Sequence, residues 1–137
     1  MSIDRFVDAQ AQTYAQALAE LKAGRKTGHW IWWIFPQLRG LGWSERSTYY
    51  GLADETEASE YLSHPVLGGR YRECLAVVHG HLCEGGEDPL TLMGGHIDVL
   101  KLRSSLELFV KASSASDKNF RAQAADILDR LDFKGSA

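Results

Sequence analysis

Polar and basic side chains stand at both ends of an aromatic stretch, and together they could bind an anion. The stretch "GHWIWWIFPQLRGLGW" contains all four tryptophans of the chain. His29 precedes the apolar block, while Gln37 and Arg39 follow it. A mostly apolar pocket with a few convergent polar groups is the usual form of a ligand site. We therefore predict a ligand-binding wall that includes Trp30 and Trp33, and the alternative is that these indoles form part of the core.

The segment "HPVLGGRYRE" is a second candidate for binding an anion. It places His64 and Arg70 around a turn that we expect to lead into a helix, where free N–H groups and the helix dipole favour negative charge. The planar guanidinium of Arg70 can hold phosphate or carboxylate with two hydrogen bonds. The alternative is that the glycines allow close packing and the arginines are solvated or paired with Glu73. The segment is not a P-loop, because the Lys-Ser/Thr pair is missing.

The segment "DVLKLRSSLELF" adds two cations and a hydroxyl. Lys101 is three residues from Ser104 and four from Ser105, so on a helix the lysine can share a face with either hydroxyl. Arg103 adds the second cation. A serine beside a lysine can act as a nucleophile, but only with desolvation and an oxyanion site. The structural alternative is a surface pair of Asp98 with Lys101.

Histidine provides the candidate general bases if the site is catalytic. His29 and His64 fit that role because an imidazole can exchange a proton near neutral pH. No motif in the chain specifies a reaction, so the sequence leaves open whether the protein is an enzyme. His79, His81 and Cys83 alternate in "HGHLC", and residues two apart on a helix point to different sides. We predict neither a metal nor a cofactor.

The elements that must position these residues are helices. Apolar residues recur at intervals of three and four in the four longest elements that we expect, at residues 3–23, 66–82, 97–112 and 118–131. Shorter helices are expected over "ADETEASEYLS" and in the aromatic stretch, where the helix stops before Pro36. Pro65 should lie in the first turn of a helix capped by Ser63. The pattern predicts one compact all-α domain over residues 1–137, with about five to eight helices.

Composition excludes several classes of protein. With 45% hydrophobic residues, the 137-residue chain is not disordered, and a net charge of −3 gives no electrostatic basis for nucleic-acid binding. The longest apolar run, from Trp30 to Pro36, is far short of the roughly 20 residues that span a bilayer. The opening "MSIDRFVDAQ" lacks the features of a secretory signal. We expect a soluble, cytoplasmic monomer that does not bind membranes.

Three motifs together resemble the bacterial family catalogued as domain of unknown function 1810. They are "HWIWWIFPQLRGLG", "YLSHPVLGGRYREC" and "DVLKLRSSLELF", and the opening "RFVDAQAQTYAQALAELKAGRK" extends the resemblance from Arg5 to Phe120 and beyond. The resemblance implies a small all-α structure and no particular activity. Some members of the family are labelled calpastatin. Calpastatin-type inhibitors are long and extended, whereas this chain is short and rich in helical stripes, so that label finds no support here.

Two functions of different classes follow from these observations. The first is a pocket for a small anionic ligand, with phosphate-bearing molecules among the candidates, where the aromatic stretch meets the "HPVLGGR" turn and the "KLRSS" helix. Its basis is the concentration of five cationic side chains in an acidic chain, those of Arg39, Arg70, Arg72, Lys101 and Arg103. The second is a non-enzymatic interaction module that binds a protein partner through exposed aromatic side chains. Exposure of the tryptophans distinguishes the two.

Metal removal tests the interpretation of the histidines and cysteines. Because their spacing does not assemble a ligand set, a chelator should leave the melting temperature of the protein unchanged. Differential scanning calorimetry with and without a chelator measures this directly. A large decrease in melting temperature would show that the spacing argument is wrong.

Overall fold

The computed structural model describes residues 2–41 and 44–132, and this part of the chain is all-α, as the periodicity predicts. Its elements are α1 (Asp4–Lys22), α2 (Ile31–Ile34), α3 (Glu45–Tyr49), α4 (Glu55–Ser63), α5 (Leu67–His79), the π-helix η1 (Gly80–Glu84), α6 (Pro89–Met93), α7 (His96–Ala112) and α8 (Lys118–Asp132). Extended pairing within the described residues is limited to one isolated bridge between Leu38 and Leu52. None of these helices combines the length and the apolar character needed to cross a membrane.

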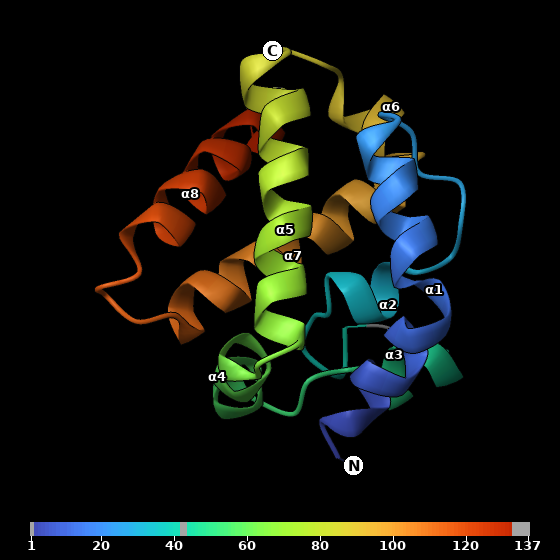
Figure 1. Ribbon diagram of the computed structural model, residues 1–137, viewed down its shortest axis with the longest axis vertical. Coiled ribbons are helices and arrows are strands. Elements are labelled where there is room, and N and C mark those ends of the chain that lie inside the picture. The colour runs from blue at the N-terminus through green and yellow to red at the C-terminus, as the bar shows by residue number, and fades with distance from the viewer. Residues whose placement is uncertain (1, 42–43, 133–137) are drawn as a thin grey trace.

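The helices enclose one apolar core around α5. Figure 1 shows α5 at the centre, with α1 on one side, α8 on the other and α7 crossing behind it. Tyr71 of α5 stacks on Phe109 of α7 with 4.2 Å between ring centroids, and Tyr61 of α4 meets Phe109 edge-on at 5.4 Å. All three rings are buried. Such aromatic pairs contribute about 0.5–1.5 kcal/mol each beyond the burial of their area, so they fix how α4, α5 and α7 pack.

A buried arginine holds the segment between α2 and α4 against α1. Arg5 donates from Nε to the carbonyl oxygen of Tyr49 at 2.7 Å and from Nη2 to that of Gly51 at 2.9 Å. Its guanidinium also makes two hydrogen bonds to the Glu57 carboxylate, at 3.0 and 3.1 Å. Burial raises the pKa of Glu57, but the hydrogen bonds from Arg5 and the Ala53 N–H outweigh it and lower the pKa. Arg5 thereby fixes the position of α3.

The start of α5 differs from the expectation. Ser63 is the last residue of α4 and does not cap α5, which begins at Leu67. His64 provides the cap, because its Nδ1 accepts the N–H groups of Val66 at 3.1 Å and Leu67 at 3.2 Å. Pro65 lies in the turn between the helices and not in a first helical turn. The backbone of His64 is extended, as the residue before a proline prefers, and this ends α4.

The helix that we expected over residues 66–82 changes its hydrogen-bonding pattern after His79. The chain continues as the π-helix η1, which a 3.6-residue periodicity does not indicate. Arg130 of α8 donates to the carbonyl oxygens of Leu82 at 2.8 Å and of Glu87 at 2.7 Å. These bonds hold η1 against α8. The side chain of Leu82 is buried, as the periodicity predicts for this position.

Two leucines of α7 test the orientation of that helix. Leu106 is fully buried, so Leu106→Ala leaves a cavity and should lower the free energy of unfolding by about 2–5 kcal/mol. Leu100 is 47% exposed on the same helix, and Leu100→Ala should change stability by no more than about 0.5 kcal/mol. Urea denaturation of both variants measures the difference. Equal losses would show that α7 is turned differently.

Candidate functional site

The tryptophan segment forms one wall of a pocket between α1, α2 and α3, which we call the tryptophan pocket. Its volume is about 200 Å³, and it is lined by Thr13, Gln16, Gly28, His29, Trp30, Trp33 and Arg46. The pocket therefore brings together His29, Trp30 and Trp33, three of the residues that the sequence singled out. The remaining lining residues come from α1, from the loop before α2 and from α3.

A carboxylate of α1 organises the wall of the pocket. Glu20 Oε1 accepts the backbone N–H groups of Thr27 and Gly28, both at 2.8 Å, and the indole N–H of Trp30 at 2.9 Å. Its other oxygen accepts from Gln16 Nε2 at 2.8 Å. Burial raises the pKa of Glu20, but these four hydrogen bonds outweigh burial and hold the pKa at about 2. Glu20 is therefore an anion in the fold, and it fixes the positions of both the loop and the Trp30 ring.

Close contacts leave no room for a larger residue at position 28. A Cβ on Gly28 would lie 2.9 Å from Cδ1 of Trp30 and 3.2 Å from Oε2 of Glu20. On the other side of the loop, the buried Lys26 donates to the carbonyl oxygen of Gly28 and pairs with Asp98 of α7 at 2.6 Å. Its Nζ lies 4.9 Å from the centroid of the Trp30 ring. The loop is therefore held between α1 and α7.

Trp33 is fixed by polar contacts at both its side chain and its backbone. Its indole N–H donates to Thr13 Oγ1 at 2.8 Å, and its ring packs on Tyr50 with 5.0 Å between centroids. Its carbonyl oxygen accepts from Gln10 Nε2 at 2.7 Å and from the Tyr61 hydroxyl at 2.9 Å. The buried Gln10 thereby links α2 to α1 and α4.

Arg46 of α3 provides the cation of the pocket. Its side chain is exposed, and with the residues that the structure describes it makes no hydrogen bond or ion pair. Ser44 caps α3, since its Oγ accepts the Ser47 N–H at 3.1 Å. Our reading of the sequence missed Arg46, although a serine followed by Glu45 is a recognisable helix start.

Arg70 lies elsewhere, beside α1. Its Nη1 donates to Gln10 Oε1 at 3.3 Å, and its guanidinium stands 4.6 Å from the centroid of the Tyr14 ring. The Tyr14 hydroxyl in turn bonds the Glu73 carboxylate. Arg70 is therefore occupied in joining α5 to α1. Its neighbour in the same motif, His64, is occupied as the cap of α5.

Arg39 and Gln37 stabilise the backbone that follows α2. Arg39 donates to the carbonyl oxygens of Thr48 and Gly51, both at 3.1 Å. Its own N–H donates to the carbonyl oxygen of Leu52 at 2.7 Å, and the Leu52 N–H donates to that of Gln37 at 2.9 Å. Neither residue lines the tryptophan pocket.

The three residues predicted on α7 do not converge on the tryptophan pocket. Lys101 places its Nζ 3.8 Å from the centroid of the Trp32 ring, on the flank of α7 that faces α2. Arg103 pairs with Glu107 at 3.7 Å, and two residues along a helix correspond to about 200° of rotation. Ser104 lines a different pocket and forms no hydrogen bond with Lys101 among the described residues. The cation of the tryptophan pocket is thus Arg46, from α3.

The tryptophans divide between the core and the pocket wall. Trp30 is 2% exposed, while Trp32 and Trp33 are half-buried. Trp43 lies outside the described residues. The largest exposure of an aromatic side chain in the described part of the chain is that of Tyr49, at 48%. Trp30 and Trp33 line the tryptophan pocket, Trp32 does not, and none of the three described indoles has the exposure that an aromatic interface requires.

The histidines of "HGHLC" bind carboxylates on different elements. His79 pairs with Asp126 of α8 at 3.0 Å, and His81 pairs with Glu87 at 2.6 Å. The hydrogen bond with Glu87 raises the pKa of His81. In residues 2–41 and 44–132, no three His, Cys, Asp or Glu side chains are grouped to hold a metal ion.

The chain is similar to known proteins over most of its length. The family model described as "Protein of unknown function (DUF1810)" matches residues 1–133. The crystal structure of the conserved hypothetical protein Rv1873 from Mycobacterium tuberculosis is 43% identical in sequence and superposes with a TM-score of 0.79. That alignment covers 89% of this chain and 84% of the other. No curated protein matches the chain.

Acid should weaken the wall that Glu20 organises. The pKa of Glu20 falls from its ordinary 4.5 to about 2 in the fold, so its stabilising contribution is present above pH 4.5 and is lost as the pH falls toward 2. Replacing Glu20 by Gln removes the charge, so the stability difference between wild type and Glu20→Gln should shrink over this range. Urea denaturation at a series of pH values measures it.

The matched control is Glu84→Gln, which removes an exposed carboxylate that does not contact the loop. When Glu84→Gln is introduced into both wild type and Glu20→Gln, the difference in the free energy of unfolding between the two should stay the same at each pH. A difference that stays constant from about pH 7 down to pH 2 would contradict the lowered pKa of Glu20.

Proposed function

The chain belongs to the family described as protein of unknown function (DUF1810), and we propose that it binds a small anionic ligand in the tryptophan pocket. One observation carries the proposal. Arg46 lines an aromatic-walled pocket and its side chain makes no hydrogen bond or ion pair with the described residues, whereas the side chains of Arg5, Arg39 and Arg70 are all engaged. An arginine at such a wall suits the planar oxygens of a carboxylate or the oxygens of a phosphate.

The polar groups of the pocket indicate where the anion would lie. The Gly28 N–H and the Trp30 indole N–H already donate to Glu20, and the Trp33 indole N–H donates to Thr13. The negative charge of Glu20 also disfavours a second anion beside Gly28. An anion therefore belongs on the Arg46 side of the pocket, where Arg46 and His29 supply donors.

The volume of the pocket limits the size of the ligand. Sites for drug-sized molecules usually have volumes of roughly 300–1,000 Å³, and the tryptophan pocket has about 200 Å³. Inorganic phosphate or a small carboxylic acid suits this volume better than a nucleotide. The half-buried Trp33 ring would cover the apolar side of such a ligand.

The geometry supports binding and assigns no reaction. A general base needs a partner that orients it, and His29 forms no hydrogen bond with a carboxylate or hydroxyl among the described residues. We accordingly propose His29 as a donor at the rim of the pocket. Its role as a base stays a prediction from the sequence alone.

Thermal shift measurements with inorganic phosphate and a series of small carboxylates test the proposal. At about 100 times its dissociation constant, a bound anion stabilises the native state by about 2.7 kcal/mol, which raises the melting temperature. Arg46→Ala should abolish the shift. Arg46→Lys keeps the charge but loses the planar fork, and it should retain only part of the shift. The wild-type tryptophan emission should change with the same dissociation constant.

Lys118→Ala is the matched control, because it removes one positive charge from the start of α8, outside the pocket. It should leave the ligand-dependent shift unchanged. A shift of equal size in wild type and Arg46→Ala, or no shift with any anion in the series, would overturn the proposal.

A further inference from the structure

The outer face of α7 begins with two exposed apolar side chains. Ile97 is 68% exposed and Leu100 is 47% exposed. Ser104, the buried Leu108 and Lys111 continue the same face at intervals of three and four residues, and we call these five residues the stripe of α7. Single exposed leucines are ordinary, but two exposed apolar side chains on one face of a helix need a reason when a hollow with further leucines adjoins that face.

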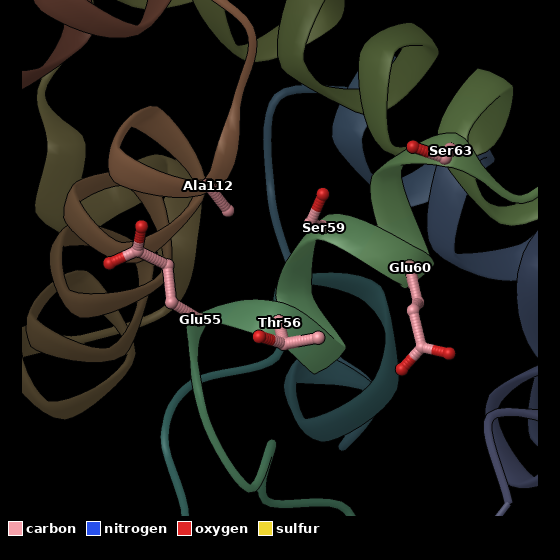
Figure 2. A pocket seen from close by; sticks show the side chains of 6 residues that line it. All are labelled: Glu55, Thr56, Ser59, Glu60, Ser63 and Ala112. Atoms are coloured by element: carbon pink, nitrogen blue, oxygen red, sulfur yellow. The ribbon is translucent and has the colours of Figure 1, made fainter.

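This stripe borders a groove. A hollow of about 560 Å³ separates Ser104 and Leu108 from Leu38 and Leu41, which follow α2 and are 37% and 58% exposed. A second hollow, of about 400 Å³, runs along α4 to Ala112 and shares Glu55 with the first. Figure 2 shows Glu55 extending from the first turn of α4 toward the end of α7 that carries Ala112. We call these two hollows together the α4–α7 groove.

The edges of the α4–α7 groove are acidic. Among the described residues that line it, the charged side chains are four carboxylates and one ammonium group, those of Asp54, Glu55, Glu60, Glu107 and Lys111. Glu55 and Glu60 make no ion pair with any residue that the structure describes. The first hollow has an apolar floor that includes Leu38, Leu41 and Leu108. Such a floor with acidic edges complements a surface that is apolar in the centre and basic on its sides.

We propose that the α4–α7 groove binds a basic amphipathic helix of a partner protein. Leucine-like side chains spaced three and four residues apart would pack between Leu38, Leu41 and Leu100, and the flanking lysines or arginines would face Glu55 and Glu107. The stripe from Ile97 to Lys111 is about 21 Å long, which matches a helix of about four turns.

The charge of the groove argues against two other occupants. An anionic membrane surface would be repelled by the carboxylates. A second copy of the chain, docked by this face, would bring two sets of acidic edges together. A basic amphipathic helix complements the groove, because its apolar face can pack on the floor and its cations can pair with the acidic edges.

The test uses a fluorescently labelled model peptide of about 18 residues, with leucines on one helical face and lysines elsewhere. Two control peptides are a permuted one of the same composition without an apolar face, and one with glutamates in place of lysines. Fluorescence anisotropy should show binding of the basic amphipathic peptide alone. Its affinity should fall as salt screens the carboxylates.

Variants of the protein locate the binding surface. Leu100→Asn should weaken binding by about tenfold, as expected for an apolar anchor at the centre of an interface. The double variant Glu55→Gln/Glu107→Gln should weaken it several-fold, and mainly at low salt. Val66→Asn, which changes an exposed apolar side chain at the start of α5, should have no effect. Arg46→Ala should also have none, because the tryptophan pocket is a separate site.

Three results would overturn the proposal. The first is equal binding of the permuted peptide, and the second is equal loss with Val66→Asn and Leu100→Asn. The third is self-association of the unliganded protein in sedimentation experiments that Leu100→Asn abolishes, which would assign the groove to a second copy.

Discussion

The carboxylate of Glu20 is the interaction on which the tryptophan pocket depends. The loop between α1 and α2 has little regular backbone pairing, so its N–H groups need other acceptors. Glu20 supplies one to Thr27 and Gly28 and also orients the Trp30 indole. An anion held by four donors needs no ligand to stabilise it, so the wall is formed before any ligand binds. Arg46 and His29 line the tryptophan pocket beside that wall.

The arginines of this protein mostly satisfy backbone carbonyl groups. Arg5 donates to three backbone carbonyl oxygens, and Arg39 and Arg130 donate to two each. Arg72 bonds the carbonyl oxygen of Leu62 while its guanidinium pairs with Asp117. A fold with several short helices has many helix ends, and each C-terminal end leaves carbonyl groups without an intrahelical partner. The architecture therefore explains most of the concentration of arginine in this acidic chain.

Sequence periodicity predicted the long helices because each of them buries one stripe in a common core. The stripe of Leu67, Tyr71 and Leu75 is buried as the spacing indicates. The candidate site was harder to predict, since the partner of a cation is often distant in sequence. Arg70 bonds Gln10, which is 60 residues away, and no local pattern reveals that contact. By contrast, the sequence alone predicts that Lys101 and Arg103 point in different directions, because residues two apart on a helix lie on different faces.

The polar contacts of α1 have a consequence for the order of events during synthesis. Arg5 bonds residues 44 to 52 positions further along the chain, and the Gln10 side chain meets Tyr61 and Arg70, 51 and 60 positions further along. At ordinary rates of translation, several seconds separate the emergence of α1 from that of these partners. Arg5 and Gln10 therefore lack these partners until about half of the chain has left the ribosome, whereas Glu20 meets Thr27 and Gly28 much earlier. The first turns of α1 can therefore complete their native contacts only after the middle of the chain has been synthesised.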